Sequence, residues 1–172
     1  MFLTPEHLIK ELNLKAGDKV LEVGSGSGAF TISLAREVGS IGQVYALDIH
    51  RDMLHTLADT LLKFNLLNVD IIWADIEKET KIDAYSLDAV VISNVLFQLT
   101  NIDKALKNIL NVLKPEGVIL VVDWSASFGG IGPKPDYVID EETAEKLLIK
   151  NNFRIVKRLP AGKYHYAIMA RA

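Results

Sequence analysis

The stretch VLEVGSGSGAF, residues 20–30, decides the fold of this chain. An apolar run that carries one acid, Glu22, ends in glycines at alternate positions, Gly24, Gly26 and Gly28, and apolar residues at helical spacing begin at Phe30. This pattern predicts a buried strand, a tight turn and a helix. Because glycine has no Cβ, backbone N–H groups and the start of the next helix can approach a ligand closely. The stretch therefore predicts a ligand site at the carboxyl end of the first strand.

The alternation of strand and helix continues along the chain. Strands are predicted over 18–23, 43–48, 69–75, 87–93 and 117–123, and helices over 4–12, 30–38, 51–64, 102–113 and 141–151. These strands lack polar alternation, as expected of a parallel sheet covered by helices on both faces. The last two strands, 153–159 and 163–170, are joined only by PAG and must pair antiparallel. The prediction is an α/β fold, a three-layer sandwich with a seven-stranded, mostly parallel sheet whose last strand is antiparallel.

Composition limits the class of protein. The 172 residues fit a single domain, 1–172, and a mean hydropathy of +0.20 leaves apolar surface over which the chain could form a homodimer. With no cysteine, disulfide frameworks, thiolate zinc sites and cysteine nucleophiles are excluded, and no metal site is expected. The segment MFLTPEHLIKEL has no basic stretch followed by an apolar one, and no apolar run approaches the roughly 18 residues of a membrane span. We therefore expect a cytoplasmic protein without a membrane span.

The last part of the chain is basic, although the net charge is −3. No acid follows Glu145, whereas the basic residues there are Lys146, Lys150, Arg154, Lys157, Arg158, Lys163 and Arg171. We interpret them as the solvated face of a terminal helix and hairpin. A patch that binds an anionic substrate or RNA is the alternative. Because the sequence pI is about 5.8, nucleic acid is not the expected partner.

Polar residues follow the ends of successive predicted strands. Asp48 ends the second strand, Asp75 the third, and Ser93 and Asn94 the fourth. Ligands of open α/β sheets bind at these carboxyl ends. Glu22 would repel a pyrophosphate but attract an ammonium, Asp48 can accept both hydroxyls of a ribose, and Asp75 can meet the edge of a base. Each residue also has a local interpretation, such as an N-cap at Asp48, but together they indicate adenosine with an amino-acid tail, which is S-adenosylmethionine.

Five motifs resemble those of the class I S-adenosylmethionine-dependent methyltransferases: VLEVGSGSG, ALDIH, WADIE, LDAVVISNVLFQL and LKPEGVILVVD. They occur in the family order and extend over essentially the whole chain. The similarity to the small, type-11-like branch that includes quinone and sterol C-methyltransferases is strongest around SNVLFQL and LKPEGVILVVD. The resemblance implies the Rossmann-like class I fold and S-adenosylhomocysteine as the product.

The resemblance also implies a role for individual residues. Glu22 would meet the methionine ammonium, Asp48 the ribose, and Asp75 with Ile76 the adenine. Ser93 would flank the methionine portion and Asn94 the acceptor side. The cofactor-binding set implied in this way is Glu22, Gly24, Ser25, Gly26, Gly28, Asp48, Ile49, Asp75, Ile76 and Ser93.

Methyl transfer from a sulfonium needs no nucleophilic side chain, because the orientation of donor and acceptor supplies much of the rate. A base is needed only when the acceptor loses a proton. Where relatives often carry histidine after SNVL, this chain has Phe97 and Gln98. The candidates for catalytic residues are Asp123 at the end of the fifth strand, Asn94, and His165 in the last strand.

The sequence thus predicts an S-adenosylmethionine-dependent methyltransferase that acts on a small molecule. The stretch 125–137, rich in glycine and proline, is predicted to form a mobile cover over the acceptor pocket. Three competing functions stay open. The chain could methylate RNA or protein, it could bind S-adenosylmethionine without catalysis as a subunit of a partner, or it could be an NAD-dependent oxidoreductase, since the glycines with Ala29 also fit the dinucleotide pattern.

Overall fold

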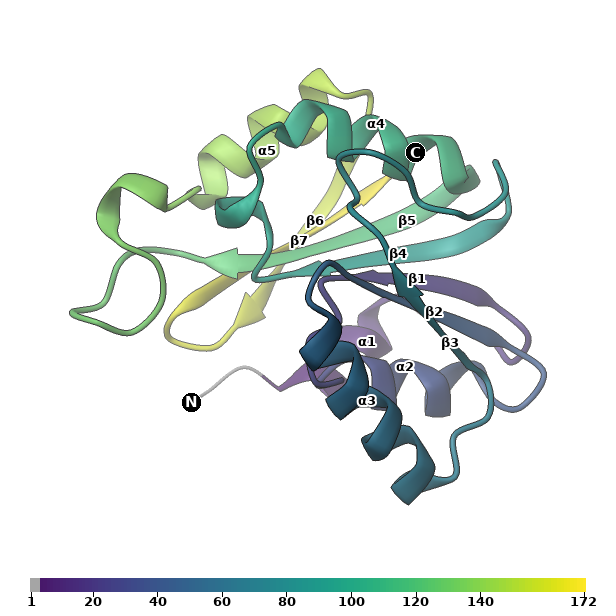
Figure 1. Ribbon diagram of the computed structural model, residues 1–172. Coiled ribbons are helices and arrows are strands. Elements are labelled where there is room, and N and C mark those ends of the chain that lie inside the picture. The colour runs from purple at the N-terminus through teal and green to yellow at the C-terminus, as the bar shows by residue number, and fades with distance from the viewer. Residues whose placement is uncertain (1–3) are drawn as a thin grey trace.

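The computed structural model describes residues 4–172, which form one seven-stranded sheet in the order β3-β2-β1-β4-β5-β7-β6 (Figure 1). Strands β1 to β5 are parallel, and β7 is antiparallel to both β5 and β6. The predicted sheet, with its antiparallel last strand, is confirmed. The strands are β1 (Lys19–Val23), β2 (Gln43–Asp48), β3 (Val69–Trp73), β4 (Leu87–Ser93), β5 (Leu113–Trp124), β6 (Arg154–Ala161) and β7 (His165–Arg171).

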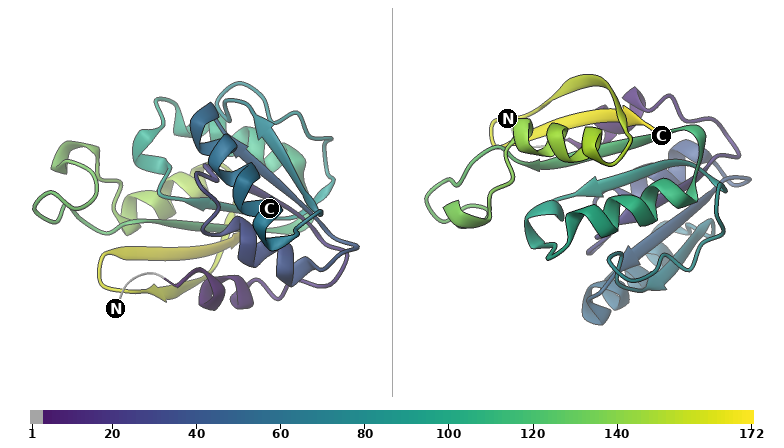
Figure 2. Two further views of the ribbon diagram at one scale, coloured as in Figure 1. Left: turned by 60° about the horizontal axis from the view of Figure 1, so that its bottom comes forward. Right: turned by 90° about the horizontal axis from the view of Figure 1, so that it is seen from above.

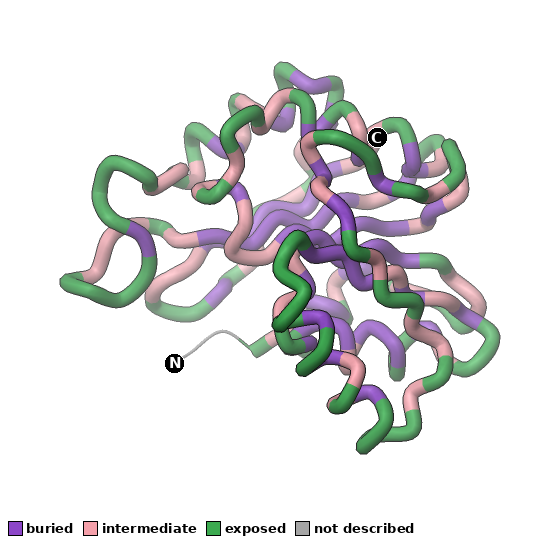
Figure 3. The backbone as a smooth tube through the Cα atoms, in the orientation of Figure 1, coloured by how far each residue is buried: buried purple, intermediate pink, exposed green. Residues whose placement is uncertain are grey.

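Helices cover both faces of the sheet, which makes the three predicted layers (Figures 1 and 2). Helices α1, α2 and α3 lie on one face, and α4 and α5 lie on the other. Figure 3 shows the central strands buried between them and the outer sides of the helices exposed. The helices are α1 (Pro5–Glu11), α2 (Thr31–Val38), α3 (Arg51–Phe64), α4 (Ile102–Val112) and α5 (Glu141–Lys150), with short 3₁₀ turns η1 (Leu96–Gln98) and η2 (Pro135–Tyr137).

Two of the strand boundaries that differ from the prediction are the start of β5 and the end of β3. Strand β5 begins at Leu113, four residues early, because Leu113 is buried and pairs with Leu87. A register shift follows this pair, and the bulge takes up Pro115, which has no N–H for the ladder, and Glu116, whose φ is 64°. Strand β3 ends at Trp73, so Asp75 lies on the connection beyond the strand.

The five predicted helices are present, each within one residue of its predicted bounds. Asp140 is the N-cap of α5, and its Oδ1 accepts a hydrogen bond from Thr143 N at 2.8 Å. Thr4 is the N-cap residue of α1 and Pro5 the first helical residue, but the Thr4 side chain makes no capping hydrogen bond. Within residues 4–172, no helix combines the length and apolar character needed to cross a bilayer.

Candidate active site

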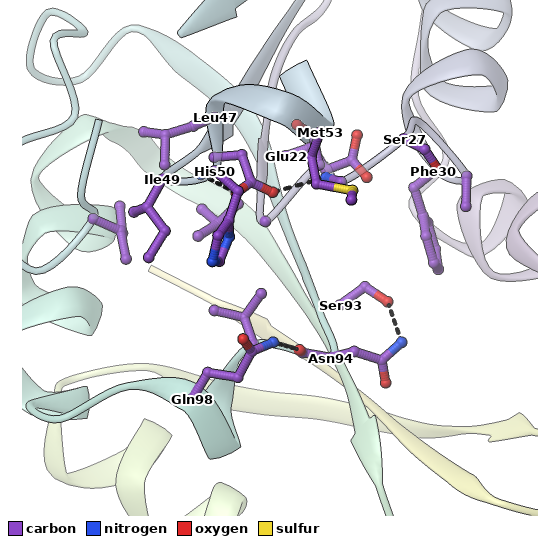
Figure 4. Close-up of a pocket in the computed structure, with 18 of the residues that line it drawn as sticks. Glu22, Ser27, Phe30, Leu47, Ile49, His50, Met53, Ser93, Asn94 and Gln98 are labelled. Atoms are coloured by element: carbon purple, nitrogen blue, oxygen red, sulfur yellow. Dashed lines mark hydrogen bonds and ion pairs between the residues drawn. The ribbon is translucent and has the colours of Figure 1, made fainter. Parts of the chain in front are cut away.

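A cavity of about 600 Å³ lies at the carboxyl ends of β1, β2 and β4 (Figure 4). Figure 4 shows Leu47, Ile49 and His50 facing Ser93, Asn94 and Gln98 across it. Nine of the ten predicted cofactor-binding residues line this cavity, and Asn94 lines it as well. The exception is Gly28, the last residue of the glycine loop (residues 24–28), where the missing side chain leaves room for Leu57, since an added Cβ would be 2.6 Å from Leu57 Cδ1.

The glycine loop is held against two neighbouring strands. Gly24 N and Ser25 N both donate to Leu47 O of β2, at 2.8 and 3.1 Å. Gly24 has a φ of 73°, and a Cβ added there would lie 2.2 Å from Val95 Cγ2, in the segment after β4. Only glycine allows this turn and this approach together. The loop and the segment after β4 are therefore packed against each other as two walls of one cavity.

Glu22 is a buried carboxyl group in the wall of the cavity, with 2% of its surface exposed. Its Oε2 accepts a hydrogen bond from Thr31 Oγ1 at the start of α2. Burial raises the pKa of Glu22 from 4.5 to about 8; the Thr31 hydrogen bond opposes this change and the charge of Asp48 adds to it. No lysine, arginine or histidine among residues 4–172 forms an ion pair with Glu22. A cationic ligand would supply the missing partner.

Asp48 joins β2 to the glycine loop. Its Oδ2 accepts from Gly26 N at 2.9 Å, and its Oδ1 accepts from His50 N at 2.8 Å and contacts His50 Nδ1 at 3.1 Å. The residue is 7% exposed and lines the cavity. A carboxylate has about four acceptor positions, so Asp48 keeps some free for the hydroxyl groups of a ligand.

The connection after β3 forms another wall. Asp75 accepts from Glu77 N at 2.9 Å and pairs with Lys78 at 3.1 Å. Burial raises the pKa of Asp75, but these hydrogen bonds outweigh burial and lower it overall. Ile76 is buried, and its carbonyl oxygen accepts from Asn108 Nδ2 at 2.7 Å. These contacts fix Asp75 and Ile76 at the edge of the cavity.

Sequence reasoning missed Glu77. It lines the cavity, and its Oε1 accepts from Thr100 Oγ1 at 2.9 Å and from Asn101 N at the start of α4. The signal available was the second acid in WADIE, two residues after Asp75. His50, Met53 and Phe30 were also missed as lining residues.

Ser93 and Asn94 form the wall opposite Leu47 and Ile49 (Figure 4). Asn94 has a φ of 58°, a left-handed conformation that asparagine adopts more readily than most residues. Its Nδ2 lies 3.5 Å from Ser93 Oγ, and its buried Oδ1 has no hydrogen-bond partner among the described residues. Asn94 Oδ1 is therefore available to accept a hydrogen bond from a ligand.

Asp123 and His165 are not among the described residues that line the cavity. Asp123 is 1% exposed and accepts hydrogen bonds from backbone N–H groups. His165 stacks on Trp124 with ring centroids 4.3 Å apart, its Nε2 is buried without a partner among residues 4–172, and burial lowers its pKa. Direct catalytic contact by either residue stays a prediction.

The stretch 125–137 extends beyond the carboxyl end of β5 (Figure 1). It is irregular except for η2 and a bridge between Phe128 and Ile131. Gly132 packs on the ring of Trp124, so that a Cβ added to Gly132 would lie 2.5 Å from Trp124 Cε3. None of these residues lines the cavity in this conformation, so the predicted cover also stays a prediction.

The lining of the cavity is acidic. It contains four acidic side chains, Glu22, Asp48, Asp75 and Glu77, and neither lysine nor arginine among the described residues, although His50 contacts Asp48 and Lys78 pairs with Asp75 from outside the lining. Such a lining favours a ligand with positive charge and disfavours phosphate groups. Within residues 4–172, no three metal-ligating side chains come together.

Comparison with known proteins identifies the family of the chain. A family model described as methyltransferase domain matches residues 14–168. The ubiquinone/menaquinone biosynthesis C-methyltransferase of Chromobacterium violaceum is 36% identical over 124 residues, 72% of this chain and 50% of that protein. The corresponding protein of Haemophilus ducreyi is 38% identical over 65% of this chain and 43% of its own length. The chain thus spans about half the length of the curated relatives that it matches.

Solved structures share the whole fold. A SAM-dependent methyltransferase from Aquifex aeolicus is 28% identical and superposes with a TM-score of 0.91 over 99% of this chain and 90% of that one. The [4+2]-cyclase SpnF, at 17% identity and a TM-score of 0.84, shares the fold alone. With the family model matching most of its length and the predicted motifs at the carboxyl ends of the strands, the chain belongs to the methyltransferase domain family and has the class I fold.

Proposed function

We propose that this chain is an enzyme that transfers the methyl group of S-adenosylmethionine to a small-molecule acceptor and leaves S-adenosylhomocysteine. The observation that carries the proposal is the lining of the cavity, where the buried Glu22 lies beside the glycine loop without an ion-pair partner among residues 4–172 and the described lining contains four acidic side chains but neither lysine nor arginine. S-adenosylmethionine has an ammonium and a sulfonium, so it supplies the positive charge that this cavity lacks.

The residues of the cavity suit the parts of this donor. Glu22 would bind the ammonium. The free acceptor positions of Asp48 would accept hydrogen bonds from the ribose hydroxyls, and Asp75 and Ile76 would contact the adenine. Bound S-adenosylmethionine supplies a methyl group activated by positive sulfur. The chain's part is to orient the two reactants and exclude water.

A small acceptor is favoured over RNA. Six of the seven basic residues after Glu145 have a carboxylate partner: Lys146 with Glu142, Lys150 with Asp103, Arg154 and Arg171 with Glu116, Lys157 with Glu11, and Arg158 with Glu145. Phosphate groups would have to compete with these carboxylates. The similar proteins of Chromobacterium violaceum and Haemophilus ducreyi, by their names, methylate carbon in quinone biosynthesis, which also supports a small acceptor.

NAD-dependent oxidoreduction and donor binding without catalysis fit the cavity less well. NAD would bring a pyrophosphate next to Glu22 without any lysine or arginine in the described lining to neutralise it. A binding protein without transferase activity would use the same donor contacts, and the [4+2]-cyclase of similar fold illustrates that the fold does not dictate the reaction. Transfer itself must therefore be measured.

We also propose that residues 1–172 act as one domain, in the cytoplasm and as a homodimer. The single sheet with core clusters on both faces supports one domain, and the lack of cysteine suits a reducing compartment. Exposed apolar side chains support a dimer interface: Ile41, Leu62, Phe64 and Leu67.

The test is transfer of a labelled methyl group. The purified protein and methyl-labelled S-adenosylmethionine are incubated in parallel with the small-molecule, RNA and protein fractions of a cell extract. We expect label in the small-molecule fraction only, and none when Asp48→Ala replaces the native protein. Label in RNA or protein would move the assignment to a macromolecular acceptor, and S-adenosylmethionine binding without any transfer would favour the binding protein.

A further inference from the structure

The segment after β4 forms the wall of the cavity that contains Asn94, which the family resemblance assigns to the acceptor side. Asn94, Val95, Gln98 and Leu99 all line the cavity, whereas Ser93 is still part of β4 and pairs with Val122. Gln98 Nε2 donates a hydrogen bond to the backbone oxygen of Asn94 at 2.7 Å. The position of the Gln98 side chain therefore depends on the backbone conformation at Asn94. We call residues 94–99 the acceptor wall.

The acceptor wall is held from one side by the glycine loop. Val95 occupies the space that the missing Cβ of Gly24 leaves open. Asn94 N donates to Val122 O at 2.9 Å, which continues the β4 ladder for one residue. Beyond Val95 the strand pairing has ended, and the chain turns into η1.

On the other side, Asp123 takes the place of a missing helix cap. Val95 is the N-cap residue of η1 and has no side-chain acceptor to offer. Asp123 Oδ2 accepts from Leu96 N, the first residue of η1, at 2.9 Å, and Oδ1 accepts from Trp124 N at 2.8 Å. The carboxylate of β5 therefore satisfies the N–H that begins the turn.

We propose that Asp123 is a positioning residue, which fixes the acceptor wall and so aims Asn94 and Gln98 at the methyl acceptor. This role rests on the function proposed above. It differs from direct catalysis because the carboxylate is 1% exposed, does not line the cavity, and has both oxygens bonded to backbone N–H groups.

The ionised form of Asp123 is the one that holds η1. Burial raises the pKa of Asp123 to about 6, although the hydrogen bonds from Trp124 and Leu96 oppose this change. Tyr166 of β7 lies opposite Asp123. Burial raises the pKa of Tyr166 above its usual range, and the negative charges of Asp123, Asp140 and Glu141 raise it further. No cationic side chain among residues 4–172 pairs with Asp123. Protonation of the carboxylate should therefore loosen the wall as the pH falls through about 6.

The test compares Asp123→Asn with the native protein. An asparagine has one acceptor oxygen where the carboxylate has two, so one of the two N–H groups loses its partner. We expect the amide of Leu96 to lose protection from hydrogen exchange. We also expect kcat/KM for the acceptor to fall roughly ten- to hundredfold, with donor affinity nearly unchanged because Ser93 is fixed by strand pairing. The decline of native activity below about pH 6 should disappear in the variant.

Asp88→Asn is the matched control. Asp88 also accepts a backbone N–H, from Lys19 at 2.9 Å, but at the opposite end of β4. We expect unchanged exchange at Leu96 in this variant.

Two results would overturn the positioning role. If the amides of Leu96 and Trp124 both keep their protection in Asp123→Asn while turnover falls, Asp123 acts directly on the reaction and not by fixing η1. If protection is lost throughout the sheet together with thermal stability, its role is general stability. Exchange at Leu96 needs no acceptor, so a native protein that fails to transfer methyl groups would contradict the proposed function and leave this measurement valid.

Discussion

Replacing Glu22 by glutamine should abolish most donor binding and, at the same time, stabilise the empty protein at alkaline pH. Glutamine can keep the hydrogen bond from Thr31 but offers no charge to an ammonium. A hydrogen bond between charged groups contributes about 1.5–3 kcal/mol, so affinity for S-adenosylhomocysteine should fall roughly ten- to hundredfold or more. Isothermal titration calorimetry measures this loss.

The stability effect follows from the pKa of Glu22. Its value in the folded protein, about 8, is above the ordinary 4.5, so the unfolded chain ionises first. The stability that the neutral carboxyl group contributes is fully present below 4.5 and is lost as the pH rises through about 8. Glutamine does not ionise, so Glu22→Gln should not lose stability as the pH rises. Thermal unfolding at about pH 8.5 should give a higher midpoint for the variant than for the native protein, with a smaller difference at about pH 5.

Glu37→Gln is the control, since Glu37 is exposed on the adjacent helix α2. It should change neither binding nor the pH dependence. If Glu22→Gln bound S-adenosylhomocysteine as tightly as the native protein, the ammonium would be bound elsewhere.

Asp48→Ala should weaken donor binding to a similar or greater extent. The substitution removes the acceptors for the ribose hydroxyls and also the anchor of the glycine loop at Gly26 N. Loss of two hydrogen bonds to a charged group amounts to roughly 3–6 kcal/mol, or at least a hundredfold in affinity. Calorimetric titration with S-adenosylhomocysteine checks it.

The substitution His50→Ala separates the contribution of the Asp48 carboxylate to donor binding from that of the His50 ring. It removes the ring contact with Asp48 Oδ1 and leaves the carboxylate and its bond to Gly26 N in place. We expect a small change in affinity. An equally large loss in His50→Ala would mean that the imidazole, and not the carboxylate, carries the binding.

Sequence patterns were sufficient to predict the sheet and to bring most of the candidate donor-binding residues to one cavity. Strands without polar alternation require two covered faces, and the carboxyl ends of parallel strands converge, so the pattern alone places Glu22, Asp48 and Asp75 together. The antiparallel end followed from the length of PAG alone, because three residues cannot form a crossover.

Contacts between segments distant in sequence could not be predicted. Strand periodicity places Asp123 at the end of β5 but does not tell whether its carboxylate reaches the cavity or a backbone N–H of η1. The packing of Val95 against Gly24 likewise depends on how two loops meet. The early start of β5 was hidden by Pro115, which normally indicates a break, because a bulge takes it out of the ladder.

The central claim is that the cavity binds an adenosyl amino acid through its carboxylates. The most direct measurement is thermal unfolding of the purified protein with S-adenosylmethionine, S-adenosylhomocysteine and NAD in parallel. Ligand at ~100 times its dissociation constant adds roughly 2.7 kcal/mol, a shift of about 5–10 °C for a chain of this size. We predict this shift with both adenosyl amino acids and none with NAD. A shift with NAD alone would contradict the account, because a pyrophosphate would then lie where Glu22 is assigned the ammonium.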